Sequence, residues 1–141
     1  MKINVVAGLI IINSKILIAK RPTGSHMEGF WEFPGGKIKV GELPEVALER
    51  ELFEELGIKT QTGVLLSTKD FTYPEKKVEL KFFMSKWVEY PMIPAFHSAI
   101  KWIGINELDN FDFPPPDSDF IEFLKNQTEL WFVENSSYPI V

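Results

Sequence analysis

Hydrophobic and polar positions along the chain predict a series of strands interrupted by two helices. Positions 3–12 are rich in β-branched residues, a turn follows at 13–15, and a mostly apolar run resumes at 16–21, a pattern typical of a hairpin. Strand-like patterns return in three later segments, with polar or turn-forming residues between them. The predicted strands are therefore 3–12, 16–21, 62–73, 78–88 and 99–105.

The two predicted helices differ in length. The first covers residues 44–56, because it opens on a proline and is followed by Gly57, which suits the left-handed position after a helix. A proline-rich bend leads into a shorter helix at 118–125, where Asp119 and Glu122 are expected to form a capping box. Strands mixed with helices of unequal length predict an α/β or α+β sandwich.

The first helix carries an acidic face. At about 100° per residue, Glu51, Glu54 and Glu55 lie on one side of it. An apolar arc is expected on the opposite side, where it can pack on a sheet, and Glu49 interrupts this arc. The arc consists of Val46, Leu48, Leu52, Phe53 and Leu56. Glutamates on a helix most often form a solvated surface. The residues around these three therefore have to show whether they form a surface or a binding site.

Those neighbours favour a bound divalent cation. Like charges at this spacing cost a few tenths of a kcal/mol per pair, and a hard ion such as Mg²⁺, held by carboxylate and phosphate oxygens, would offset that cost. Arg50 could orient one of the carboxylates through a bidentate contact. Gly35 and Gly36 allow the backbone to approach a ligand closely, and their carbonyl groups could add a metal ligand.

Composition and charge narrow the class of protein. The 141 residues suffice for a buried core, and residues 1–141 are expected to form a single domain. The chain has no cysteine and two histidines, which excludes disulfides and thiolate sites and disfavours a histidine-rich zinc site. Its net charge of −5 argues against stable binding to nucleic acid or anionic membranes. The first apolar run is too short to span a bilayer and lacks the basic region of a signal, so a cytoplasmic location is expected.

The spacing of residues around the first helix resembles the complete signature of the Nudix hydrolases. Gly36 is followed after five residues by Glu42, and after seven more by the run RELFEELGI at 50–58. The resemblance implies a mixed β-sheet sandwiched between helices, with this stretch as a loop–helix–loop box that binds Mg²⁺ or Mn²⁺. It also implies attack by water on a nucleoside diphosphate linked to another group.

Two further stretches resemble the MutT branch of that family: KRPTGSHMEGFWEFPGGKIKVGE at 20–42 and FPPPD at 113–117. The branch implies hydrolysis of oxidised nucleoside triphosphates such as 8-oxo-dGTP to the monophosphate and pyrophosphate, which clears the nucleotide pool. Residues 1–126 would be the family-like core, and the tail at 127–141 has no assigned role. Modified cytidine triphosphates, dinucleotides or nucleotide sugars stay open as substrates, as does a non-catalytic nucleotide-binding module. A monomer or a homodimer is expected.

Carried over position by position, the resemblance assigns roles to individual residues. The catalytic group would comprise Glu42, Arg50, Glu51, Glu54 and Glu55. The metal would be held by the carbonyl group of Gly35 and by Glu51, Glu54 and Glu55. The nucleotide would contact Arg21, His26, Glu32, Phe33, Pro34, Gly35 and Asp117, the last at the edge of the base. Taken singly, Arg21 could be a surface charge, His26 a loop histidine and Asp117 a helix cap.

Two positions depart from the MutT pattern. Asp117 stands where the branch usually has asparagine; an ionised aspartate only accepts hydrogen bonds and must be protonated to donate one, so the base preference is open. Phe96 lies six residues before Trp102, where many members carry a glutamate that binds metal or acts as general base. The adjacent His97 could be the base or an ordinary loop histidine; otherwise a glutamate of the acidic face has to act.

Overall fold

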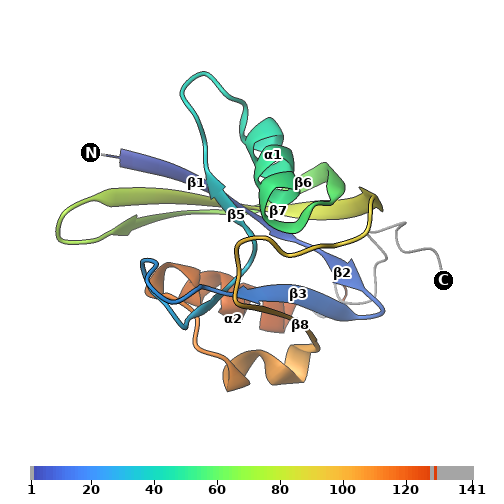
Figure 1. Ribbon diagram of the computed structural model, residues 1–141. Helices are drawn as coiled ribbons and strands as arrows, with labels where there is room; N and C mark the ends of the chain where they lie inside the picture. The colour runs from blue at the N-terminus through green and yellow to red at the C-terminus, as the bar shows by residue number, and fades with distance from the viewer. Residues whose placement is uncertain (1, 128, 130–141) are drawn as a thin grey trace.

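The computed structural model describes residues 2–127 and 129. Over these residues the chain forms two four-stranded sheets, two α-helices and two short 3₁₀ helices (Figure 1). This mixture of sheet and helix confirms the predicted α+β architecture. The predicted tail at 127–141 lies, apart from residues 127 and 129, outside the described residues.

The first sheet has the strand order β5-β1-β7-β6. Its strands are β1 (Lys2–Leu9), β5 (Gly35–Lys37), β6 (Lys59–Thr72) and β7 (Lys77–Glu89). β1 runs parallel to β7, and the other pairs are antiparallel, so the sheet is mixed.

The second sheet is built around β3 (Lys15–Lys20). β2 (Ile11–Ile12) and β4 (Trp31–Glu32) pair with its two ends, and β8 (Ala99–Ile103) pairs along its length. All of these pairs are antiparallel. Only two residues separate β4 from β5. The chain therefore passes directly from the second sheet into the first shortly before α1.

The predicted strand at 3–12 is wrong in one respect, because it breaks at Ile10 into β1 and β2. The two halves belong to different sheets, so the chain has to turn between them. The predicted hairpin is confirmed for its second half, where β2 pairs with β3. Asn13 and Ser14 connect these strands with φ of 53° and 60°, the positive values that a tight two-residue hairpin turn requires.

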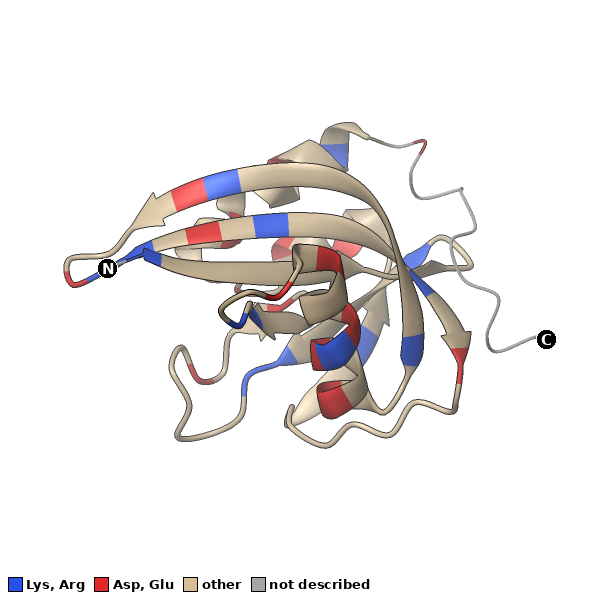
Figure 2. Ribbon diagram, turned by 90° about the horizontal axis from the view of Figure 1, so that it is seen from above, with Lys and Arg blue, Asp and Glu red and all other residues tan. Residues whose placement is uncertain are grey.

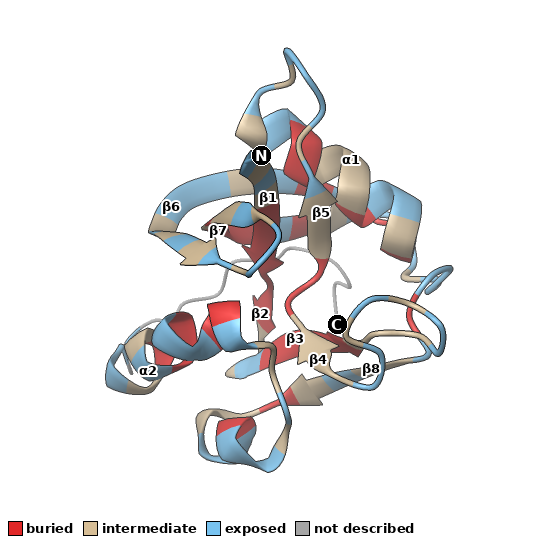
Figure 3. Ribbon diagram, turned by 90° about the vertical axis from the view of Figure 1, so that its left-hand side faces the viewer, coloured by how far each residue is buried: buried red, intermediate tan, exposed pale blue. Residues whose placement is uncertain are grey.

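The helices cover opposite faces of the first sheet (Figures 1 and 3). They are α1 (Pro44–Leu56) and α2 (Ser118–Asn126), and the 3₁₀ helices η1 (Ile105–Asn110) and η2 (Pro115–Asp117) precede α2. Side chains alternate across β1, so Val6 packs in the apolar cluster of α1 and Ala7 in that of α2. No helix in the described range is long and apolar enough to cross a membrane.

The packing face of α1 differs from the predicted arc. Its buried residues are Ala47, Leu48, Leu52 and Leu56. Val46 and Phe53, predicted to be buried, are 51% and 56% exposed. Glu51 and Glu55 lie within the packing face instead, with side chains 17% and 12% exposed. The helical period explains this, because Leu48 and Leu52 fall about 20° and 60° from Glu55 and not opposite it.

The segment after α1 explains the glutamate that interrupts the predicted arc. Gly57 ends the helix at φ 72° and donates its N–H to the Phe53 carbonyl at 2.9 Å, as predicted. β6 begins at Lys59, three residues before the predicted start, and runs past the helix. The Glu49 carboxylate accepts the backbone N–H of Thr62 at 3.0 Å. This hydrogen bond therefore links β6 to α1.

The capping box predicted for α2 does not form. Asp119 pairs with Lys69 of β6 at 2.5 Å, and Glu122 pairs with Lys125 at 3.1 Å. η2 runs directly into α2, so the first turn of α2 follows another helical turn and not an extended residue with a capping side chain.

Candidate active site

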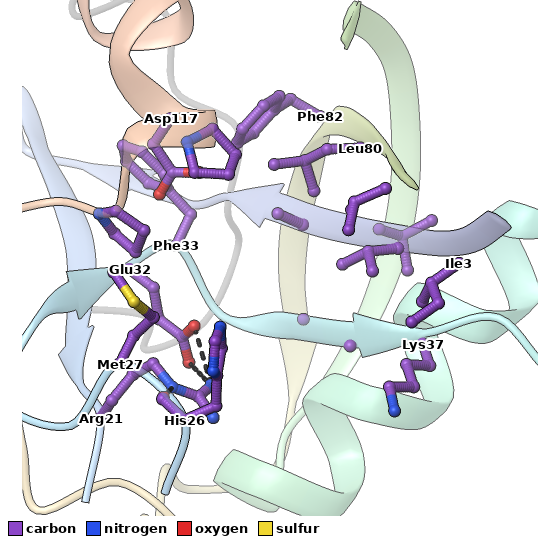
Figure 4. Close-up of a pocket in the computed structure, with 18 of the residues that line it drawn as sticks. Ile3, Arg21, His26, Met27, Glu32, Phe33, Lys37, Leu80, Phe82 and Asp117 are labelled. Atoms are coloured by element: carbon purple, nitrogen blue, oxygen red, sulfur yellow. Dashed lines mark hydrogen bonds and ion pairs between the residues drawn. The ribbon is translucent and has the colours of Figure 1, made fainter. Parts of the chain in front are cut away.

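A cavity of about 330 Å³ opens between the first sheet, β4 and the segment before α2 (Figure 4). It gathers most of the residues predicted to contact a nucleotide, namely Arg21, His26, Glu32, Phe33, Gly35 and Asp117. Pro34, predicted with them, is buried behind the wall, and its carbonyl accepts the N–H of Gly8 at 2.9 Å. Figure 4 shows Asp117 and Arg21 at different ends of the cavity, with apolar side chains such as Leu80 between Asp117 and Lys37.

Arg21 and Glu32 form the charged end of the cavity. Arg21 Nη1 donates to both carboxylate oxygens of Glu32 at 3.1 and 3.2 Å, and its Nε donates to the His26 carbonyl. The imidazole of His26 meets the Tyr73 ring edge to face at 6.0 Å. Arg21 is therefore a paired residue of the cavity wall and not an isolated surface charge.

Asp117 lies at the other end, in the turn before α2. It is 6% exposed, and its side chain makes no capping hydrogen bond to α2, so the helix-cap interpretation fails. Burial, followed by the negative charge of Glu32, raises the pKa of Asp117 to about 8. At pH 7 the carboxyl group is therefore mostly protonated and has both an O–H donor and a carbonyl acceptor.

Glu55 is the most strongly perturbed carboxyl group of α1. Burial, followed by the charges of Glu32 and Glu51, raises its pKa to about 9, against a smaller opposing effect of a hydrogen bond from the Gly35 backbone. Its Oε1 is buried and has no hydrogen-bond partner among the described residues. A buried carboxylate oxygen beside two other acids is an environment that a cation would stabilise.

The two glycines before α1 lie in close contact with neighbouring groups. A Cβ on Gly36 would lie 2.4 Å from the carboxyl carbon of Glu51, so the glycine leaves the space that this carboxylate occupies. A Cβ on Gly35 would lie 2.0 Å from the carbonyl oxygen of Val6 on the neighbouring strand. The predicted close approach is thus observed, but to the protein's own carboxylate and backbone.

Arg50 joins the loop before α1 to the acidic residues of the helix. Its Nε and Nη2 donate to the two carboxylate oxygens of Glu42 at 2.8 and 2.9 Å, and this pair lowers the pKa of Glu42 to about 2. Nη1 donates to Glu51 at 2.9 Å and to Glu54 at 3.2 Å, while Nη2 also reaches the Lys37 carbonyl at 3.0 Å. Acidic residues accordingly flank a basic one on α1 (Figure 2).

The acidic residues fit a divalent cation in part. Glu51 and Glu55 adjoin each other, and the free Oε1 of Glu55 is a suitable ligand. Glu54 is 52% exposed and turns toward Arg50. Across residues 2–127 and 129, no three histidine, cysteine, aspartate or glutamate side chains lie close enough together to hold a metal ion by themselves. A metal here would need oxygens from the backbone, water or a substrate in addition.

The sequence alone did not identify two residues of this region and left the role of a third open. Tyr73 and Lys76, at the turn between β6 and β7, line the cavity, and the Lys76 ammonium lies 5.6 Å from the Tyr73 ring centre. His97, considered only as a base or a loop residue, is buried with Nε2 2.7 Å from Glu32. Phe96 beside it is 42% exposed. The turn between β6 and β7 is far in sequence from the other residues of the cavity. It reaches the cavity because β7 pairs with β1, and the local sequence pattern does not reveal that pairing.

A family model described as "NUDIX domain" matches residues 6–123, which include the whole of α1 and most of the residues that line the cavity. The chain belongs to the NUDIX domain family. Its Gly36, Glu42 and Arg50 to Glu55 thus occupy the loop–helix–loop of a Nudix protein, as the resemblance implied. The geometry above is therefore that of a Nudix box, in which Arg50 holds the loop and Glu51 and Glu55 face inward.

Three known proteins illustrate what this Nudix chain is similar to. The "8-oxo-dGTP diphosphatase" of Proteus vulgaris is 46% identical over 88 residues, which cover 61% of this chain and 79% of that protein. The "CTP pyrophosphohydrolase" of Escherichia coli (strain K12) is 32% identical over 120 residues, 85% of this chain and 89% of that protein. The crystal structure of the MutT protein from Methanosarcina mazei Go1 superposes with a TM-score of 0.80 at 26% identity, over 91% of this chain and 96% of that one.

Proposed function

We propose that the protein hydrolyses oxidised nucleoside triphosphates such as 8-oxo-dGTP to the nucleoside monophosphate and pyrophosphate, with Mg²⁺ or Mn²⁺ as cofactor. The observation that carries the proposal is the pair Glu51 and Glu55: the Glu51 carboxylate fills the space beside Gly36, and the buried Oε1 of Glu55 has no hydrogen-bond partner among the described residues. The similarity to a protein named 8-oxo-dGTP diphosphatase supports this choice of substrate. Clearing damaged nucleotides from the pool would protect DNA replication.

Glu51, Glu55 and the carbonyl group of Gly35 would hold the metal, with phosphate and water oxygens completing its ligands. When bound, the metal neutralises phosphate oxygens and lowers the pKa of a bound water. Arg50, anchored on Glu42, keeps Glu51 in place. The exposed Glu54 is the carboxylate we assign to accept the proton of the attacking water, since no carboxyl group stands at Phe96.

Arg21 and Asp117 would fix the nucleotide at the two ends of the cavity. The Arg21 guanidinium offers N–H donors to the sugar or phosphates. Protonated Asp117 offers a donor and an acceptor side by side, as an asparagine amide does. The edge of 8-oxoguanine presents O6, an acceptor, next to N7–H, a donor, whereas guanine presents two acceptors there. A neutral Asp117 therefore matches the oxidised base better than the normal one.

A second candidate substrate is a cytidine triphosphate. One relative is named CTP pyrophosphohydrolase, and an ionised Asp117 would accept a hydrogen bond from the amino group of cytosine. The ionised carboxylate has only acceptors and so suits the cytosine amino group, whereas the contact proposed for 8-oxoguanine needs the protonated form. Among the described residues, no contact or charge in the cavity favours a dinucleotide or a nucleotide sugar as substrate. None of them favours a non-catalytic nucleotide-binding role either.

The proposal is tested by pyrophosphate release from a panel of normal and oxidised nucleoside triphosphates in Mg²⁺. We expect 8-oxo-dGTP to be turned over with the highest kcat/KM, and Asp117→Asn to retain that preference because its amide offers the same donor and acceptor. If cytidine triphosphates are preferred, the second candidate is correct. We also propose a cytoplasmic single-domain protein, monomeric or homodimeric, without stable binding to nucleic acid.

A further inference from the structure

His97 lies between Glu32 and Glu55, two of the acidic groups of the site. Its side chain is fully buried, with Nε2 2.7 Å from Glu32 Oε2 and 3.9 Å from Glu55 Oε1. Glu32 already accepts hydrogen bonds from Arg21 on both oxygens, so it is the acceptor and Nε2 of His97 carries the hydrogen. Nδ1 of His97 has no hydrogen-bond partner among the described residues. The bond to Glu32 is therefore the polar contact that orients this ring.

Backbone hydrogen bonds hold the segment 91–98 against two other elements. Two of its N–H groups donate to the last carbonyl groups of α1 at 2.8 Å each: Ile93 to Leu56 and Ala95 to Glu55. The N–H of Ser98 donates to the carbonyl of Lys20 in β3 at 3.1 Å. His97 is thereby fixed relative both to the helix that carries Glu55 and to the strand that leads to Arg21.

The effect of this arrangement reaches Arg21. The ring of Phe96 meets the His97 ring edge to face at 4.9 Å, and the Arg21 guanidinium lies over the same Phe96 ring at 5.7 Å. The guanidinium is thus held by Phe96 on one face and by Glu32 and the His26 carbonyl at its edge. Nη2 is the guanidinium nitrogen not engaged in these contacts.

We propose that His97 is a positioning residue: through its hydrogen bond to Glu32 it holds the Arg21 guanidinium at the angle at which that group binds the nucleotide. The inference rests on the proposed function for the identity of the nucleotide. It gives the histidine beside Phe96 a role different from that of a general base. Its loss should weaken nucleotide binding more than it slows the chemical step.

The kinetic test compares His97→Leu, which removes the donor, with His97→Gln, whose amide can donate from a similar place. Ser98→Ala is the matched control, since it removes only a weak side-chain contact of 3.4 Å in the same segment. With 8-oxo-dGTP, we expect His97→Leu to raise KM about tenfold with little change in kcat, and His97→Gln to recover most of the loss. On a Glu32→Gln background the same leucine substitution should have little further effect, because the two residues act in series.

A second readout does not depend on turnover. The chain has two arginines, Arg21 and Arg50, so the NMR spectrum of arginine Nε–H groups contains two signals, which Arg21→Lys assigns. His97→Leu should move the Arg21 signal and leave that of Arg50, while Ser98→Ala moves neither. An unmoved Arg21 signal overturns the inference, as do additive losses with Glu32→Gln or a fall in kcat at constant KM. A wild type that hydrolyses no triphosphate overturns the proposed function, and the NMR result then decides the inference alone.

Discussion

The buried carboxyl group of Glu55 should make the metal-free protein less stable as the pH rises. Its pKa is 4.5 for an unperturbed group and about 9 in the folded protein. Between these values the unfolded chain is ionised while the folded chain keeps the proton, so unfolding releases a proton. Stability contributed by this group is therefore complete below pH 4.5 and falls by roughly 1 to 2 kcal/mol for each pH unit up to about 9.

The assay is chemical denaturation of the metal-free wild type, Glu55→Gln and Glu54→Gln at pH 5.5 and 7.5. Glutamine cannot ionise, so we expect Glu55→Gln to gain about 3 kcal/mol relative to wild type between these two pH values. Glu54→Gln is the matched control, because that side chain is 52% exposed and should follow the wild type. Added Mg²⁺ should stabilise the wild type and not Glu55→Gln. Equal pH dependence of wild type and Glu55→Gln would refute the reasoning.

Three further outcomes follow from the geometry. The wild type should lose stability as the pH rises from 4 to 8, and Asp117→Asn should remove part of that loss, because the substitution replaces a group with a pKa of about 8. Chemical denaturation over this pH range measures the difference. Gly36→Ala should leave the melting temperature within a few degrees but lower kcat/KM at least about tenfold, since the new methyl group displaces the Glu51 carboxylate; unchanged kinetics would contradict this. Glu49→Ala should cost about 1 kcal/mol of stability with normal kcat/KM, because it leaves the Thr62 N–H unpaired.

The fold was largely predictable because its strands and α1 show their period in the sequence. Pro44 and Gly57 marked the ends of α1 correctly. The break of the first strand was not predictable, because Ile10 is as apolar as Leu9 and Ile11 on either side of it. The chain leaves the first sheet there only because β2 pairs with β3 in the second sheet. The capping box failed because Asp119 found a long-range partner in Lys69.

The candidate site was predictable where the Nudix signature is local, and not where it depends on tertiary contacts. The sequence placed Glu51 and Glu55 on one side of α1 but put the packing face opposite them, whereas burial of Glu55 is what perturbs its pKa. The position of His97 against Glu32 joins residues 65 apart, which no local pattern contains.

The proposed function requires that the carboxylates of α1 hold the metal that drives triphosphate hydrolysis. It is tested most directly by the rate of pyrophosphate release from 8-oxo-dGTP in Mg²⁺ for wild type and Glu55→Gln. We expect release by the wild type that stops when the metal is chelated, and a rate at least a hundredfold lower for Glu55→Gln, in line with the several kcal/mol that a catalytic metal supplies. A Glu55→Gln protein as active as wild type would contradict the account.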